Sequence, residues 1–251
     1  MSSEKTLAIV LRVIEFSESS CVVGLFTREF GKIGALAKGA RRPKSPFESA
    51  LDLLAVCRIV FLHKSSEALD LLTEAKLERR FRAATRDLSR LYAGYYVAEL
   101  LNELTDSSDP HPVLFEAADA TLLALDGESE PAQVVLRFEL ALLRELGHFP
   151  SLDQCVGCGR RMAPGRRTAF GQLAGGVLCP RCRAGQRQVI SISAGAMEAL
   201  QRLADPDNHA WPQTRLDRRL RGELRGILNH YVTNLLGRRP RMHAYLGGLA
   251  E

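Results

Sequence analysis

The first third of the chain carries short runs of hydrophobic and β-branched residues separated by turn-forming residues. Leu7, Ile9, Leu11 and Val13 alternate along the first run, and a polar turn follows it. The runs predict strands over residues 7–14, 21–27, 32–37, 51–62 and 69–76. Five short strands in about 70 residues are typical of a small closed barrel of the OB type, and a barrel of the SH3 type has a similar pattern.

Hydrophobic residues recur at helical spacing from residue 78 to residue 147, and again after residue 192. Tyr92, Tyr95 and Tyr96 follow this spacing, so we expect them to face a helical core rather than to stack on a ligand. The spacing predicts helices over residues 88–104, 113–125, 132–146, 193–204 and 215–236. Gly147 and Pro150 are typical of the end of a helix.

Four of the six cysteines form one pattern between these helices. Cys155 and Cys158, then Cys179 and Cys182, give the spacing C-x2-C-x20-C-x2-C, which is typical of a single structural Zn²⁺ site with four thiolates. A pair of redox disulfides or an iron site are the alternatives. The surrounding residues, 151–190, are rich in glycine and arginine with little hydrophobic periodicity, so metal binding is expected to stabilise this segment.

These patterns together predict an α+β fold. An N-terminal OB-fold β-barrel is followed by an all-α domain that carries a four-cysteine zinc-binding module. The predicted parts are the barrel over residues 1–78, the first part of the helical domain over 79–150, the zinc-binding module over 151–190, and C-terminal helices over 191–251 that complete the helical domain. Cys21 and Cys57 lie in predicted strands and are expected to be small core residues.

Composition and charge narrow the functional classes. Hydrophobic residues make up 46% and charged residues 25% of the 251 positions, which excludes a disordered chain or a collagen. Residues 1–80 have 13 basic against 10 acidic side chains, residues 81–150 have 5 against 12, and residues 151–251 have 16 against 7. Two basic ends around an acidic middle favour a polyanionic partner, most often nucleic acid, although uneven charge is also common in cytoplasmic proteins.

A basic loop and an arginine-rich C-terminal region are the candidate nucleic-acid contacts. The loop between two predicted strands contains four cations, and Lys32 lies on the strand before it; the candidates are Lys32, Lys38, Arg41, Arg42 and Lys44. Cationic loops on an OB barrel bind the phosphate backbone with little sequence preference. Nearby Phe26, Phe30, Phe47 and Phe61 are expected to be mostly core. Possible further contacts to DNA or to a partner's tail are Arg215, Arg218, Arg219, Arg225, Arg238 and Arg239.

Signatures of enzymes and of membrane or secreted proteins are missing from the sequence. There is no GxxxxGK[ST], GxGxxG after a strand, GxSxG or HExxH motif. We therefore expect no catalytic residues and no enzymatic activity. No apolar stretch approaches the ~20 residues that a membrane helix needs. The N-terminus has no cleavage site of a signal peptide, so a cytoplasmic location is expected.

The order of these parts resembles the bacterial RecO family of recombination mediators and DNA-annealing proteins. The resemblance rests on GLFTREFGKIGALAKGARRPKS at residues 24–45, FELALLRELGHFPSLDQCVGCGR at 138–160 and GGVLCPRC at 175–182. The region 205–215 matches least well. The resemblance implies an OB-fold domain, a helical domain and an inserted zinc-binding module. It maps the family's basic loop onto Lys38, Arg41, Arg42 and Lys44, and the metal ligands onto the four cysteines.

The resemblance also implies a function without catalysis. Members of the family bind single- and double-stranded DNA, anneal complementary strands and act with RecR. With RecR they help load RecA onto single strands covered by single-stranded-DNA-binding protein, whose acidic C-terminal tail they contact. Such a protein would act at the bacterial nucleoid. A zinc-ribbon transcription factor, an RNA- or ribosome-associated OB protein and, more distantly, a nuclease are the alternative functions.

Overall fold

The chain divides into two compact units, Met1–Glu128 and Ser129–Glu251. The computed structural model describes residues 2–47, 50–64, 68–85, 87–163, 165–214 and 216–246. The boundary between the units lies between two consecutive helices, so the acidic helical segment 79–150 contributes to both. The division into four parts made from the sequence stays a prediction. Among the described residues, no helix is both long and apolar enough to cross a membrane.

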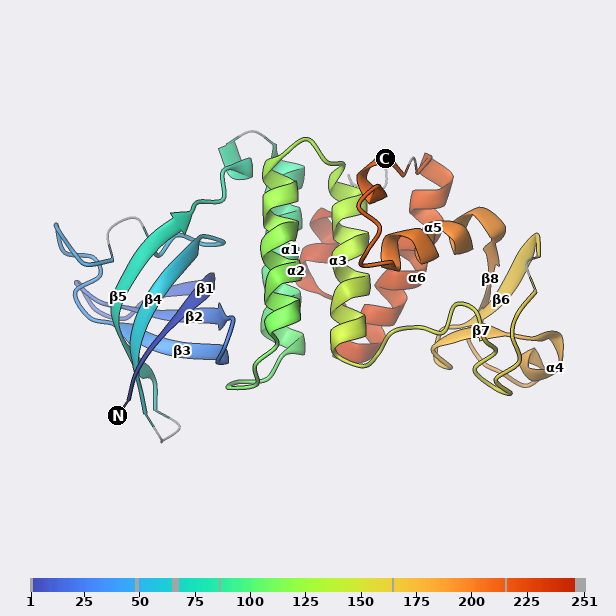
Figure 1. Ribbon diagram of the computed structural model, residues 1–251, viewed down its shortest axis with the longest axis horizontal. Helices are drawn as coiled ribbons and strands as arrows, with labels where there is room; N and C mark the ends of the chain where they lie inside the picture. Colours follow the sequence, from blue (N-terminus) through green and yellow to red (C-terminus); the bar gives the residue numbers. More distant parts are fainter. Residues whose placement is uncertain are drawn as a thin grey trace. The chain divides into compact units, whose positions relative to one another are not determined.

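The first unit contains a closed five-stranded barrel (Figure 1). Its strands are β1 (Ser2–Glu15), β2 (Cys21–Thr27), β3 (Gly31–Ala37), β4 (Val56–His63) and β5 (Asp70–Arg79). The strand order is β1-β2-β3-β5-β4, and β1 closes the barrel by pairing antiparallel with both β2 and β4. The parallel pair of β3 and β5 is the only parallel one among the described barrel strands. The predicted barrel is confirmed.

The barrel core is built from small and branched side chains that alternate along the strands. Ala8, Val10, Val23, Leu25 and Ile59 are fully buried in it, because alternate residues of a strand point to the same face. The antiparallel register of β1 and β2 shifts between Val10 and Arg12. Such a bulge increases the local bend of a strand, which helps a short sheet to close.

The fourth predicted strand begins too early. The hydrophobic residues from 51 onward predict a strand to residue 62, but β4 starts at Val56. Leu54 stands in a turn with a positive φ of 65°, and its backbone N–H donates to the carbonyl of Val10 at 2.8 Å. The hydrophobic side chain of Leu54 is buried without being in a strand, so burial and not strand structure explains the apolar pattern.

Two helices complete the first unit. They are α1 (Leu88–Leu104) and α2 (Pro112–Asp126), preceded by the 3-10 turn η1 (Ala83–Thr85). Asp87 begins α1 by accepting a hydrogen bond from the backbone N–H of Ser89. A Cβ at Gly94 would come within 2.7 Å of Leu54, so glycine lets α1 approach the barrel. Tyr96 is fully buried, which confirms that the first predicted helix faces a core.

The second unit packs helices against a small sheet. Its elements are α3 (Pro131–Glu145), β6 (Arg167–Gly171), β7 (Gly176–Leu178), α4 (Pro180–Arg183), β8 (Val189–Ser193), α5 (Ala194–Ala204), η2 (Trp211–Gln213), α6 (Arg218–Leu236) and η3 (Arg241–Tyr245). The helix α6 begins at the Asp217 cap and ends at Gly237, whose φ is 66°. Leu136, Leu200 and Leu224 join α3, α5 and α6 in one core.

The second unit also contains a three-stranded sheet, β7-β6-β8, which the sequence did not predict. Phe170, Val177 and Ile192 are fully buried in the same core as the helices. The segment therefore contributes side chains to a hydrophobic core and does not depend on metal alone. Strands of three to five residues are too short to show a hydrophobic period in the sequence, which is why they were not predicted.

Candidate metal centre and nucleic-acid interface

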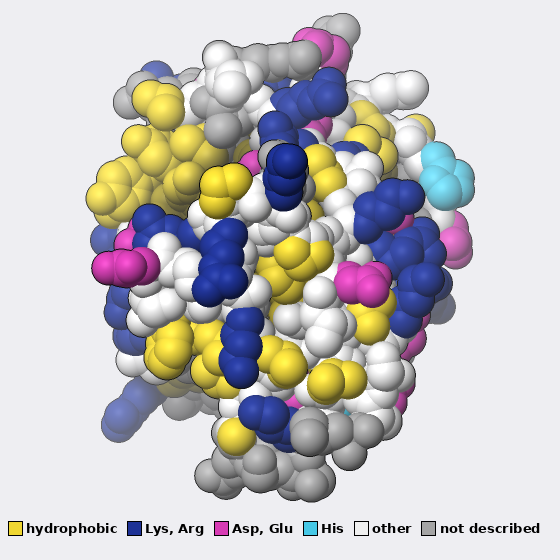
Figure 2. Space-filling model, turned by 90° about the vertical axis from the view of Figure 1, so that its left-hand side faces the viewer, with side chains coloured by type: hydrophobic (Ala, Val, Ile, Leu, Met, Phe, Trp, Pro, Cys, Tyr) yellow, Lys and Arg dark blue, Asp and Glu magenta, His cyan; other side chains and the backbone are white. Residues whose placement is uncertain are grey.

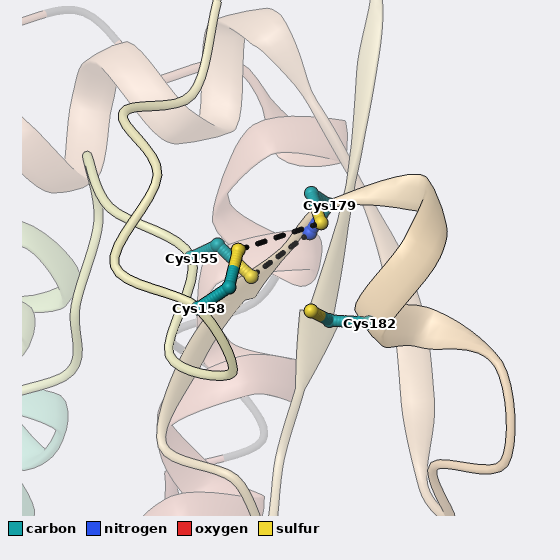
Figure 3. Close-up of side chains that lie close together, drawn as sticks. All are labelled: Cys155, Cys158, Cys179 and Cys182. Atoms are coloured by element: carbon teal, nitrogen blue, oxygen red, sulfur yellow. Dashed lines mark hydrogen bonds between the residues drawn. The ribbon is translucent and has the colours of Figure 1, made fainter.

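The four predicted metal ligands converge on one point (Figure 3). Cys155 and Cys158 lie in the loop after α3, Cys179 follows β7, and Cys182 lies in α4. Their four Sγ atoms lie within 4.8 Å of one another, and those of Cys158 and Cys179 are 3.9 Å apart. A tetrahedral site with Zn–S bonds of about 2.3 Å has sulfurs about 3.8 Å apart. The cysteine cluster therefore has the size to bind a metal ion.

A backbone N–H group in the cluster favours the deprotonated, thiolate form of Cys155. The N–H of Cys179 donates to Sγ of Cys155 at 3.3 Å, and this hydrogen bond lowers the pKa of the Cys155 thiol to about 6. The neighbouring sulfurs, Cys179 first, raise the pKa of Cys182 to about 12. All four sulfurs cannot ionise together while they repel one another. A bound cation removes this repulsion, so the donor set fits a metal.

Glycine allows the two cysteine pairs to approach each other. A Cβ at Gly157 would lie 2.9 Å from Cβ and 3.1 Å from Sγ of Cys182. The turn around it is closed by the N–H groups of Cys158 and Gly159, which both donate to the carbonyl of Cys155. This sharp turn brings the first two sulfurs to one side. A glycine at position 157, inside the first C-x2-C pair, is therefore a geometric requirement of the site.

The basic loop of the barrel is exposed. Lys38, Arg41, Arg42 and Lys44 all lie at the surface between β3 and β4. The loop rests on the turn between β1 and β2, because the N–H of Arg41 donates to the carbonyl of Ser19 at 3.0 Å. The guanidinium of Arg41 also pairs with Glu15 at 3.0 Å, an exposed ion pair that contributes little stability. Figure 2 shows many basic and few acidic side chains on this face of the barrel.

Lys32 lies apart from the exposed cations of the loop. Its Nζ donates to the backbone carbonyls of Asn102 and Thr105, the second at 2.6 Å, at the end of α1. The last carbonyls of a helix have no partner within the helix, so Lys32 satisfies groups that would otherwise need water. Burial lowers its pKa against the opposing effect of Asp106 and Glu103. Its contact with DNA stays a prediction.

The aromatic residues near the loop are core residues, with one exposed exception. Phe26, Phe47 and Phe61 are buried, and Phe30 packs against the barrel core that contains Phe47 and Phe61. Phe16 was not singled out from the sequence, yet its side chain is 65% exposed. It stands at the turn between β1 and β2, on which the basic loop rests. A hydrophobic residue just before a Ser-rich turn was the available signal.

The C-terminal arginines have different surroundings. Arg218, Arg219, Arg238 and Arg239 are exposed, whereas Arg215 lies outside the described residues. Arg225 is 5% exposed, and its Nη1 lies 3.0 and 3.1 Å from the two carboxylate oxygens of Glu139 on α3. This corrects the expectation for Arg225. Its position on the inner face of α6 makes it part of the core rather than a contact for DNA or a partner.

The fold and the cysteine cluster define a class of protein: a small OB-like β-barrel, followed by helices and by a module whose four cysteines could hold a metal ion. Comparison with known families is consistent with this class. Residues 1–81 match the family model described as Recombination protein O N terminal, and residues 85–243 match Recombination protein O C terminal. The chain belongs to the Recombination protein O, or RecO, family.

Relatives match over nearly the full chain. The DNA repair protein RecO of Rhodopirellula baltica is 43% identical over 263 residues, covering 96% of this chain and 97% of the relative. The protein of the same name from Myxococcus xanthus is 34% identical and covers 92% of both chains. That of Symbiobacterium thermophilum is 34% identical, over 96% of this chain and 95% of the relative.

Proposed function

We propose that this protein is a DNA-binding recombination mediator in recombinational DNA repair. It anneals complementary single strands and, with RecR, helps load RecA onto single-stranded DNA covered by single-stranded-DNA-binding protein. The family match supports the role in repair. The single observation that carries DNA binding is the cluster of exposed cations, Lys38 to Lys44, on one loop of an OB-like barrel.

The loop is suited to binding a phosphate backbone. Its cations project from a backbone that is held by hydrogen bonds to the neighbouring turn, including those from Arg41 and from Gly39 to the side chain of Ser20. Phe16 beside it offers an aromatic surface on which a base stacks, and such stacking contributes about 1–3 kcal/mol per base. Charge and stacking without base-edge donors favour single strands of any sequence.

Annealing requires that two strands be bound, but it requires no covalent chemistry. Two complementary strands repel through their phosphates, and a protein that neutralises both raises their effective concentration. The protein acts in this way as a non-enzymatic mediator. The exposed C-terminal arginines Arg218, Arg219, Arg238 and Arg239 are candidates for the second strand or for the acidic tail of single-stranded-DNA-binding protein. A cytoplasmic place at the bacterial nucleoid accords with these partners.

The metal is one structural Zn²⁺. Four thiolates complete a tetrahedral shell and leave no position for water, so the ion would stabilise the fold and not react. Cys155, Cys158, Cys179 and Cys182 would bind it. No other group of three or more metal-ligating side chains comes together among the described residues.

The proposed DNA site is tested with the variant Arg41→Ala/Arg42→Ala. Loss of two phosphate contacts is expected to lower the salt dependence of single-strand binding, the slope of log K against log salt, by about 1.4. Affinity at about 0.1 M salt should fall roughly tenfold for all sequences alike. Fluorescence anisotropy with labelled DNA and RNA of matched sequence measures both, and annealing of strands coated with the binding protein is followed in parallel.

The control variant is Arg28→Ala/Arg58→Ala. Both of these exposed arginines belong to the same unit, and each pairs with a carboxylate, Glu116 at 2.8 Å and Glu78 at 2.9 Å. The control removes the same charge but is expected to change binding less than the loop variant. Equal losses in the two variants would mean that total charge, not the loop, determines binding. Preference for RNA, or no acceleration of annealing, would contradict the proposed function.

A further inference from the structure

The sequence segment that carries the four cysteines contains basic but no acidic side chains. Residues 154–197 contain seven arginines and neither Asp nor Glu, although the chain average of 29 acidic residues in 251 predicts about five in a segment of this length. All seven arginines are exposed. We name them the module arginines: Arg160, Arg161, Arg166, Arg167, Arg181, Arg183 and Arg187.

The module arginines have few partners of their own. Arg167 hydrogen-bonds to Ser191 and lies 3.9 Å from Glu223. Within the described part of the chain, the side chains of the other six have no ion pair or hydrogen bond. An exposed guanidinium without a carboxylate keeps its full charge available for a ligand. This distinguishes these residues from Arg202 of the same unit, which pairs with Glu198 at 2.7 Å.

The charge of the metal site does not account for the module arginines. A Zn²⁺ ion with four thiolates carries a net charge of about −2. Seven positive charges against two leave an excess of about five on this segment. Local neutralisation of the thiolates would need about two cations, so the remainder is available to an external polyanion.

Three of the arginines are positioned by the cysteine turns themselves. Arg160 lies two residues after Cys158, and Arg181 and Arg183 flank Cys182. At 3.8 Å per residue each Cα lies within about 8 Å of the Cα of a ligating cysteine. The backbone is fixed at these points, because the carbonyl of Arg160 accepts from Cys155 at 2.9 Å and the N–H of Arg183 donates to Cys179 at 3.0 Å. The Cα atoms that carry these three guanidinium groups therefore lie close to the cysteine cluster.

We infer that the module arginines form a second binding surface for the phosphate backbone of single-stranded DNA, separate from the loop of the barrel. This inference rests on the proposed function and extends it, because it assigns the second strand of an annealing pair to the cysteine module. Arginine binds phosphate in a planar, two-pronged geometry and keeps its charge at any cellular pH. Metal binding orders the surface, and the barrel loop binds the first strand.

The test measures the capture of a second strand by the full-length, zinc-loaded protein. An oligothymidylate of about 30 nucleotides on beads is loaded with protein, and a labelled oligothymidylate of the same length is offered; the two cannot pair, and each exceeds the site of one OB fold. In Arg160→Gln/Arg181→Gln/Arg183→Gln, capture of the second strand should fall at least roughly tenfold. The slope of log K against log salt for this capture should fall by about 2. Binding of the first strand should change by less than about twofold. Arg202→Gln is the matched control and should leave capture unchanged.

Two further variants separate charge from structure. The triple Arg→Lys variant at the same positions keeps the charge and should retain most of the capture. Zinc content is measured for every variant. If the triple Gln variant loses zinc, the pair Arg166→Gln/Arg187→Gln, farther from the cysteines, is used and should lower capture by a smaller factor, with its salt slope reduced by about 1.4.

The outcomes distinguish this inference from the proposed function. Unchanged capture in the zinc-loaded Gln variants, or an equal loss in Arg202→Gln or in the Lys variant, would overturn the second surface. A wild-type protein that binds the first strand but captures no second would overturn it too, while leaving DNA binding by the barrel intact. A wild-type protein that binds neither strand would overturn the proposed function itself.

Discussion

Buried ionisable side chains make the second unit sensitive to substitution and to pH. Arg225 and Glu139 are 5% and 0% exposed, and they bond to each other across α6 and α3. Removing one member of such a pair leaves an uncompensated charge and typically costs 3–5 kcal/mol. His243 is buried beside this pair, and burial, with smaller effects from Arg225 and Arg239, lowers its pKa to about 4. The neutral imidazole is therefore the form that the fold stabilises.

His243 makes the stability of the second unit depend on pH. Between the ordinary pKa of 6.5 and the folded value of about 4, the unfolded chain binds a proton that the folded chain does not. The free energy of unfolding is therefore expected to fall as the pH falls from about 6.5 towards 4, by about 3 kcal/mol at most. Above pH 7, His243 is neutral in both states, so its contribution to the free energy of unfolding no longer changes with pH.

Trp211 provides the measurement, because it is the single tryptophan and lies in the second unit. Urea unfolding followed by its fluorescence is compared between the wild type and His243→Gln over pH 4.5 to 7.5. The difference between the two proteins isolates His243 from the cysteine site, which also responds to acid. Parallel pH profiles for both would show that His243 does not titrate in this way.

At the scale of elements, one side chain joins a barrel strand to a helix end. Lys32 on β3 donates to the carbonyls of Asn102 and Thr105 where α1 ends. A cation at the C-terminus of a helix also interacts favourably with the helix dipole. This contact explains why a basic residue is held at the junction of strand and helix, apart from the exposed loop.

The variant Lys32→Met is expected to destabilise the first unit by about 1–2 kcal/mol. It removes charge-assisted hydrogen bonds and leaves two carbonyls without a partner, while methionine keeps the apolar stem. Hydrogen exchange of amides in β3 and α1 measures the change. Lys38→Met, at the exposed start of the basic loop, is the control and should leave exchange unaltered. Equal protection in both variants would show that the Lys32 contact contributes nothing.

At the scale of the whole molecule, the barrel and the cysteine module are expected to respond differently to loss of metal. The barrel core contains no residue of the cysteine module. Within the second unit, Phe170 and Ile192 belong to the helical core, whereas Leu178 and Cys179 belong to a smaller cluster around the cysteines. We therefore expect a bound metal to be a local source of stability around residues 151–190.

Chelation of the metal should expose residues 151–190 to trypsin while the first unit resists cleavage. The turns around the cysteines contain Arg160, Arg161, Arg181 and Arg183, so their opening creates new tryptic sites. The loss of bound metal removes the folding free energy that it supplied. Mass spectrometry of the fragments measures the sites, and added Zn²⁺ should restore resistance. Identical fragments with and without chelator would contradict a structural metal.

Long periodic elements could be predicted from the sequence. Strand β2 was predicted with its observed ends, and the helices α1 to α3 differ from prediction by one residue at most at either end. The cysteine cluster was predicted because C-x2-C spacing lets two nearby sulfurs point to one side. The sheet β7-β6-β8 was not, because its strands are too short for a period. The roles of Lys32, Phe16 and Arg225 also escaped prediction, since each depends on what lies beside it in space.

The amino-acid sequence by itself determined the barrel, the helices, the cysteine pattern and the excess of positive charge. These follow from periodicity, spacing and composition, which are properties of neighbouring residues along the chain. Only the tertiary structure decided which basic side chains are exposed and which are held by other groups of the fold. Arg225 is buried and Lys32 is engaged, whereas the loop and module arginines are exposed. The free energy of a charge depends on its surroundings in three dimensions, and one-dimensional order does not specify those surroundings.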